Sequence, residues 1–203
     1  MYCDEVLLDN DFCNMFHELN KPDSKINVDE LYNKMILQIG KKPCIHKYIA
    51  DSELLLNPFI QEKIEKHEIR IIDFPEILKE DDSQLYYESL FMEYYKFLKG
   101  KEFVGDVFKS RKAGESYGEI HSLITAFFLG IPIFLSNDNG AKLLADKKIN
   151  TKNNLHVQVI SGFDLLMKYE TSFSKQERKA ILSLHETWKD RWKKLKEQQT
   201  GKQ

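Results

Sequence analysis

The sequence predicts an α/β fold of three layers, in which a central parallel sheet of about five strands is flanked by helices. Short apolar runs alternate along the chain with segments whose apolar residues recur at helical spacing. Most of these intervening segments are long enough for the helical crossovers that parallel strands require. The expected strands are Val6–Leu8, Cys44–Ile49, Glu68–Phe74, Ile131–Leu135 and Leu155–Ile160.

The helices are predicted from apolar spacing and from residues typical of helix ends. The segment Val28–Ile39 is followed by Gly40, and the aromatic-rich segment Ser83–Leu98 ends shortly before Gly100. Glycine is the preferred residue at helix C-termini because it adopts a left-handed conformation without strain. Further helices are expected over Phe12–Leu19, Gly118–Phe128, Gly140–Asp146, Phe163–Tyr169 and from Ser174 to about Gln198.

The composition is that of an ordinary globular protein, with 42% hydrophobic and 31% charged residues in a chain of 203. No apolar run approaches the roughly 20 residues that cross a bilayer, and the N-terminal residues carry acids where a signal peptide has basic residues. The three cysteines form no CxxC pair, so neither a zinc site nor a disulfide framework is indicated. We therefore expect a cytoplasmic protein that does not enter membranes.

Charge is distributed unevenly along the chain. From Lys175 onward nine Lys and Arg face four Asp and Glu, a net charge of +5, which leaves −7 for the first 174 residues. We expect residues 1–172 to form the main domain, and residues 173–203 to form a basic amphipathic helix and tail. The acidic body suits metal-binding carboxylates, whereas the basic tail suits RNA phosphates or an acidic partner.

Acidic residues recur where the expected strands end. Asp9 follows the first strand, Glu53 the second and Asp138 the fourth, and Glu119 lies in the first turn of the helix before the fourth strand. Ligands of parallel sheets bind beyond the carboxyl ends of the strands, so these side chains can converge. Clustered carboxylates repel one another unless a cation lies among them, and Mg²⁺ and Mn²⁺ take oxygen ligands. The pattern predicts a metal site.

Each of these acids also has a purely structural alternative. Either Asp9 or Asp11 could be the N-cap residue of the helix that begins near Phe12, and Asp138 could cap the helix Gly140–Asp146. Ser116 and Glu119 have the spacing of a capping box, and Glu53 would be a solvated helix residue. Convergence of the side chains in one cleft is the observation that favours the metal site over these alternatives.

Three segments resemble the motif blocks of PIN domains: VLLDNDF (Val6–Phe12), GESYGEIHS (Gly114–Ser122) and GIPIFLSND (Gly130–Asp138). Their order and spacing agree with that family along most of residues 1–160. The resemblance implies a PIN-like fold, here with helical insertions, and a pocket of acids that binds Mg²⁺ or Mn²⁺. It also implies ribonuclease activity, as in the VapC-type toxins of toxin–antitoxin pairs.

The position of each acid within these blocks suggests its role. The resemblance implies that Asp9, Glu119 and Asp138 bind the metal ion, and that Glu53 is a further catalytic acid near the second strand. The implied reaction is hydrolysis of an RNA phosphodiester bond by metal-activated water, which needs no nucleophilic side chain.

Two of these assignments stay open at the level of sequence. Asp51 lies two residues before Glu53, and the local sequence does not decide between them. Glu115 is a rival for Glu119, because some members of the family place a Gly-Glu pair at that position.

Two other functions fit parts of the sequence. The segment Leu7–Asp11 also resembles the apolar strand and Asp-x-Asp motif of haloacid-dehalogenase-like phosphatases, in which Asp9 would be a phosphorylated nucleophile. The sequence matches the later motifs of that family poorly, and a phosphatase function would not explain the helix from Gly118. The second alternative is a PIN-like scaffold that binds RNA or a protein without cutting.

The C-terminal segment carries a continuous apolar stripe on an otherwise charged helix. The members of the stripe are three or four residues apart: Ile181, Leu184, Trp188, Trp192 and Leu195. Three roles are considered for it: docking onto the protein's own domain, a homo-oligomer contact through Trp188 and Trp192, or binding of an antitoxin-type protein.

Overall fold

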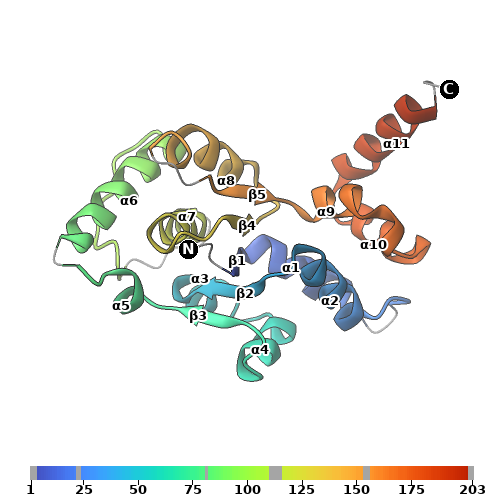
Figure 1. Ribbon diagram of the computed structural model, residues 1–203, viewed down its shortest axis with the longest axis horizontal. Coiled ribbons are helices and arrows are strands. Elements are labelled where there is room, and N and C mark those ends of the chain that lie inside the picture. The colour runs from blue at the N-terminus through green and yellow to red at the C-terminus, as the bar shows by residue number, and fades with distance from the viewer. Residues whose placement is uncertain (1–3, 22–23, 81, 110–115, 153–155, 201–203) are drawn as a thin grey trace.

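The computed structural model describes residues 4–21, 24–80, 82–109, 116–152 and 156–200, and it has the expected three-layer α/β architecture (Figure 1). In these residues five strands form one sheet in the order β3-β2-β1-β4-β5, and every neighbouring pair is parallel. The strands are β1 (Glu5–Leu8), β2 (Lys42–His46), β3 (Arg70–Ile72), β4 (Ile133–Leu135) and β5 (Gln158–Ile160).

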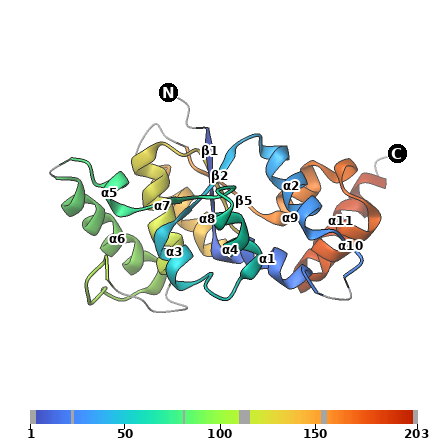
Figure 2. The same cartoon turned by 90° about the horizontal axis from the view of Figure 1, so that it is seen from below.

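Helices cover the sheet in two groups (Figure 1). One group is centred on α7, which contacts α3, α5, α6 and α8, while in the other α1 contacts α2 and α4, and α2 contacts α9. Figure 2 shows α10 and α11 at the end of the molecule opposite α5 and α6. The described helices are α1 (Asn10–Leu19), α2 (Val28–Ile39), α3 (Lys47–Ser52), α4 (Pro58–Glu65), α5 (Phe74–Ile77), α6 (Ser83–Lys99), α7 (Tyr117–Leu129), α8 (Asn139–Leu144), α9 (Gly162–Lys168), α10 (Lys175–Ser183) and α11 (Glu186–Thr200), with a π-helical turn at Ala145–Ile149 and a 3₁₀ turn at Glu170–Ser172.

The central strand β1 is buried on both faces. Val6, Leu7 and Leu8 are fully buried, which explains why this strand reads as a continuous apolar run rather than an alternating one. No helix in the described part of the chain combines the length and the apolar character needed to cross a membrane.

Two expected strands end earlier than predicted. The second was expected over Cys44–Ile49, but β2 ends at His46, whose Nδ1 atom accepts a hydrogen bond from the backbone N–H of Tyr48 and so caps α3. The third was expected to reach Phe74, but the carboxylate of Asp73 accepts the N–H of Phe74 and starts α5. Apolar residues occur on both sides of each boundary, Ile45 and Tyr48 at the first and Ile72 and Phe74 at the second, so hydrophobicity alone does not mark where the strand ends.

The expectation of one helix from Ser174 to about Gln198 was wrong. The chain leaves the helix after Ser183 and starts α11 at Glu186. This break allows Ile181 on α10 and Trp188 on α11 to be buried together, at 0% and 4% exposure. The rings of Trp188 and Phe163 lie 5.8 Å apart between centroids, so the stripe docks here onto the protein's own α9.

Candidate functional site

The sheet reverses its strand order between β1 and β4, since β2 and β3 follow on one side and β5 on the other. Such a switch point leaves a crevice at the carboxyl ends of the two central strands, where α/β proteins bind ligands. A cavity of about 460 Å³ lies here. Its lining residues are Asp9, Asn10, Asp11, Ser52, Glu53, Lys99, Ser116, Glu119 and Asp138.

Asp9 connects the ends of the two central strands. Its backbone N–H donates to the carbonyl of Leu135 over 2.9 Å, which extends the pairing of β1 with β4. Its Oδ1 atom accepts the N–H of Asn10 over 2.9 Å and caps α1, and its Oδ2 atom accepts the hydroxyl of Ser136 over 2.7 Å. The capping role and the place in the cavity therefore belong to the same residue, which is 3% exposed.

Asp11 is a cavity acid that sequence reasoning did not assign to the site. Its Oδ1 atom accepts the backbone N–H of Asn137 over 3.1 Å and lies 3.3 Å from the hydroxyl oxygen of Ser136. The amide of Asn137 also donates to the Asp11 carbonyl over 3.3 Å and accepts the N–H of Gly162 over 2.9 Å. The Asp-x-Asp spacing was visible in the sequence, but it was interpreted as helix capping or as a phosphatase motif.

Glu119 and Asp138 come from α7 and from the turn after β4, and both side chains line the cavity. Asp138 caps α8 by accepting the N–H of Gly140. The Oε2 atom of Glu119 is buried and has no hydrogen-bond partner among the described residues. The capping box suggested for Ser116 and Glu119 is absent from this helix start, because Ser116 has a left-handed backbone (φ 59°) and makes no side-chain cap bond.

Glu53 reaches the cavity from the C-terminal end of α3, whereas Asp51 is exposed and does not line it. The Glu53 carboxylate lies against Gly118 at the start of α7. A Cβ atom at position 118 would lie 2.8 Å from both carboxylate oxygens, so glycine is required for this approach. The rival acid Glu115 lies outside the described residues.

Lys99 is a second cavity residue that the sequence did not reveal. It is the last residue of α6 and lines the acidic cavity together with the five carboxyl groups. Nothing near it in the sequence marks it, because the contact depends on how α6 packs beside α7 and α8. Its ammonium group brings a positive charge to an otherwise acidic cavity.

Burial and mutual repulsion raise the pKa values of the cavity acids. Burial raises the pKa of Asp9 well above its usual value, and the nearby charges of Asp11 and Glu119 add to the effect. Burial, followed by the charge of Asp138, raises the pKa of Glu119 to about 8. Burial raises the pKa of Glu53 to about 7, with a further contribution from Asp11. At neutral pH this cluster therefore retains protons that isolated carboxylates would lose.

The donor set fits a hard divalent cation, although no ready-made ligand shell is present. All candidate ligands are carboxylate oxygens, the type that Mg²⁺ and Mn²⁺ prefer, and the Oε2 atom of Glu119 is buried without a partner among the described residues. Within the described ranges, no three or more His, Cys, Asp or Glu side chains already have the arrangement of a metal site. A cation would therefore have to displace protons and draw the side chains closer.

Replacement of Gly118 by alanine tests the contact with Glu53. We expect the effect of Gly118→Ala on the free energy of unfolding to be less favourable, by about 1–2 kcal/mol, in the wild-type chain than in a Glu53→Ala background. Only the wild-type chain has the Glu53 carboxylate where the new methyl group would lie. In the Glu53→Ala background alanine should stabilise α7 through its higher helix propensity. Urea unfolding of the four proteins in the cycle measures this coupling, and additive effects would contradict the contact.

Comparisons of this chain with protein-family models, with curated proteins and with solved structures find no match. The site is therefore interpreted from its own chemistry. It is an acid-lined cavity at the switch point of a parallel α/β sheet, with one lysine at its edge.

Proposed function

We propose that this protein is a PIN-like endoribonuclease that hydrolyses RNA phosphodiester bonds with the help of Mg²⁺ or Mn²⁺. The observation that carries the proposal is the gathering of five carboxyl groups in one cavity at the switch point of the sheet. Structural capping explains Asp9 and Asp138 individually, but it does not explain why Glu53 and Glu119 are held in the same buried place against their mutual repulsion.

Asp9, Glu119 and Asp138 are the proposed metal ligands, with Asp11 and Glu53 beside them. A bound Mg²⁺ or Mn²⁺ would polarise the phosphate and acidify the attacking water. Each lining carboxylate oxygen has two lone pairs, so the hydrogen bonds that Asp9 accepts leave it able to bind a cation.

The rest of the cavity orients these acids and the substrate. The hydroxyl of Ser136 lies within hydrogen-bond distance of both Asp9 and Asp11, and the carboxylate of Glu53 lies against Gly118. Such neighbours fix the direction of ligand oxygens, which governs metal affinity and activity. Lys99 supplies a positive charge that attracts the scissile phosphate.

The acids that share the cavity with Asp9 favour the nuclease over the haloacid-dehalogenase-like phosphatase. In the phosphatase the helix that carries Glu119 into the cavity has no role, whereas in the nuclease Glu119 is a proposed metal ligand.

Cleavage of RNA in Mn²⁺ buffer tests the proposed function. We expect wild-type protein to cut single-stranded or structured RNA, and Asp138→Asn to lower the rate on the order of 100-fold or more, because a metal ligand loses its charge. Asp51→Asn is the matched control, since Asp51 is exposed and outside the cavity. Hydrolysis of phosphomonoesters without RNA cleavage would indicate the phosphatase, and RNA binding without cleavage would indicate the non-catalytic scaffold.

A toxin role with an antitoxin-type partner rests on the family resemblance alone. The apolar stripe offers less surface for that partner, or for a homo-oligomer contact, than the sequence suggested, because Trp188 is covered by its own chain. Trp192 is half-buried and retains some accessible surface. Light scattering of the purified protein, alone and after Trp192→Ala, measures whether this surface joins two copies.

A further inference from the structure

Two smaller cavities adjoin the acidic cavity on the side of the C-terminal helices. One, of about 230 Å³, shares Asn10 and Asp11 with it, and the other, of about 120 Å³, shares Asp138. His185 and Trp188, at the junction of α10 and α11, line both smaller cavities. We call the two together the α11 recess.

Positive charge is placed on the wall of this recess. Lys142 on α8 and Arg191 on α11 both line the smaller cavity and are exposed. The guanidinium of Arg191 lies 4.5 Å from the centroid of the Phe163 ring, which helps to hold its position. Neither cation forms an ion pair with another described residue, whereas Arg178 on α10 pairs with Glu170 over 3.8 Å.

The acids that line the smaller cavity beside Lys142 and Arg191 are Asp138 and Asp164, while Asp11 and the exposed Glu18 line the other cavity. The carboxylate of Asp164 accepts the backbone N–H and the hydroxyl of Ser161, over 3.0 and 2.7 Å, in a capping box. Asp138 is shared with the acidic cavity. Lys142 and Arg191 are therefore available for an anion that approaches past Asp138.

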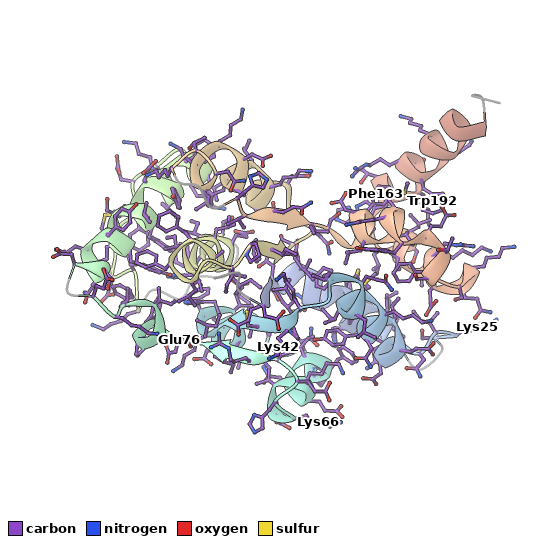
Figure 3. The ribbon with its side chains drawn as sticks, in the orientation of Figure 1. Lys25, Lys42, Lys66, Glu76, Phe163 and Trp192 are labelled. Atoms are coloured by element: carbon purple, nitrogen blue, oxygen red, sulfur yellow. The ribbon has the colours of Figure 1, made fainter. Side chains whose placement is uncertain are left out.

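A nucleic-acid strand needs such cations beside this particular site. Its phosphates are repelled by a cavity with five carboxyl groups, and neighbouring lysine and arginine side chains offset that repulsion. Figure 3 labels Phe163 on α9 and Trp192 on α11. The smaller cavity is lined by Asp164 of α9 and by Trp188 and Arg191 of α11, so its wall is built from the body and the C-terminal helix together. The two cavities of the recess are also small, at about 230 and 120 Å³, which suits a single strand rather than a duplex.

We infer that the α11 recess binds the single-stranded part of an RNA next to the scissile phosphate, with Lys142 and Arg191 contacting its flanking phosphates. The inference rests on the proposed ribonuclease function and adds the path of the substrate to it. It assigns the basic C-terminal helix a role in substrate binding, in addition to its packing on the domain.

RNA binding by a double variant tests the inference. Lys142→Gln/Arg191→Gln is compared with Lys147→Gln/Lys193→Gln, which removes the same charge from the same two regions of the chain. All four side chains are exposed, and position 193 lies about 200° around the helix from position 191. The probe is a fluorescein-labelled single-stranded RNA of about 12 nucleotides. Its anisotropy is measured with Ca²⁺ between about 50 and 200 mM salt, and gels confirm that the probe stays intact.

We expect the Lys142/Arg191 variant to bind about tenfold more weakly than wild type, with a salt slope smaller by about 1.4, because each lost phosphate contact on a single strand contributes about 0.7. The Lys147/Lys193 variant should bind within about twofold of wild type. In cleavage assays the Lys142/Arg191 variant should raise KM more than it lowers kcat.

Several results would overturn the inference: equal binding and salt slopes for the two variants, equally tight binding of a duplex of the same sequence, or no binding by wild type. The proposed function fails separately. If wild type binds RNA through Lys142 and Arg191 but never cuts it, the recess assignment stands and the nuclease does not. If wild type cuts RNA and the Lys142/Arg191 variant has an unchanged KM, the nuclease stands and the recess assignment fails.

Discussion

Metal-free protein is expected to become less stable as the pH rises from about 5.5 to about 8.5, and Glu119→Gln is expected to remove much of this loss. The pKa of Glu119 is about 8 in the folded protein, against an ordinary value of 4.5. A carboxyl group whose pKa is raised by folding stabilises the folded state while it is protonated, and that contribution is lost as the pH rises through the folded-state value. The shift corresponds to an effect on the order of 4 kcal/mol.

Other acids make the protein more stable as the pH rises, but they do so over a lower pH range. Hydrogen bonds and ion pairs with lysines lower the pKa values of Asp73, Glu93 and Glu177 overall, against the opposing effect of burial. Their contribution is present above the ordinary carboxyl pKa and is lost as the pH falls below it. Between about pH 5.5 and 8.5 the raised pKa values of Glu53 and Glu119 lower the stability as the pH rises, and Glu119→Gln isolates the share of Glu119.

Thermal unfolding in EDTA at several pH values measures this effect. At about pH 8.5 Glu119→Gln should melt several degrees above wild type, and near pH 5.5 the two should be similar. Asp51→Asn, at an exposed position outside the cavity, should follow wild type. Mn²⁺ at high pH should raise the wild-type Tm more than that of Glu119→Gln, because ligand binding stabilises the folded state. A wild-type Tm that is constant or increases over this pH range would falsify the raised pKa of Glu119 in the folded protein.

Trp188→Ala is expected to destabilise the protein by about 3–5 kcal/mol, the usual cost of removing a large buried aromatic side chain. Trp188 is 4% exposed, and its ring centroid lies 5.8 Å from that of Phe163 and 5.1 Å from that of His185. The variant leaves a cavity where α11 is attached to the body, so α11 should also become accessible to proteases before the sheet unfolds.

Urea unfolding and limited proteolysis measure the two effects of Trp188→Ala. Trp192→Ala is the matched control, since it removes the same side chain one helical turn later from a half-buried position. It should cost clearly less free energy. If the two substitutions had equal and small effects, α11 would not be docked through Trp188, and the wall of the α11 recess would lose its support.

Much of the fold followed from local patterns. The five strands lie within the predicted ranges or within two residues of them wherever the structure describes those ranges, and helix ends at Gly40, Gly100 and Gly130 adopt the left-handed conformation expected of glycine caps. These features could be predicted because each depends on residues close together in the sequence. The position of Asp9 and Asp138 after their strands could be predicted for the same reason.

The rest of the site depends on contacts between distant segments. Lys99 reaches the cavity through the packing of α6, and Gly118 is needed only because Glu53 approaches it from α3. In the sequence Asp11 was considered only as a helix cap or as part of a phosphatase motif, because a cap and a site acid have the same local pattern. The structure places it in the lining of the cavity, with hydrogen bonds to residues 136 and 137.

The sequence by itself determined the α/β class, the parallel strands and the set of acids at their ends, because periodicity and turn chemistry act over a few residues. Tertiary structure alone decided that Glu53 rather than Asp51 enters the cavity, and that five carboxyl groups share it. It also decided that the C-terminal segment breaks so that Trp188 docks onto α9. These outcomes depend on burial and on packing between distant segments, which no local sequence pattern records. Burial is also what raises the pKa values of the acids.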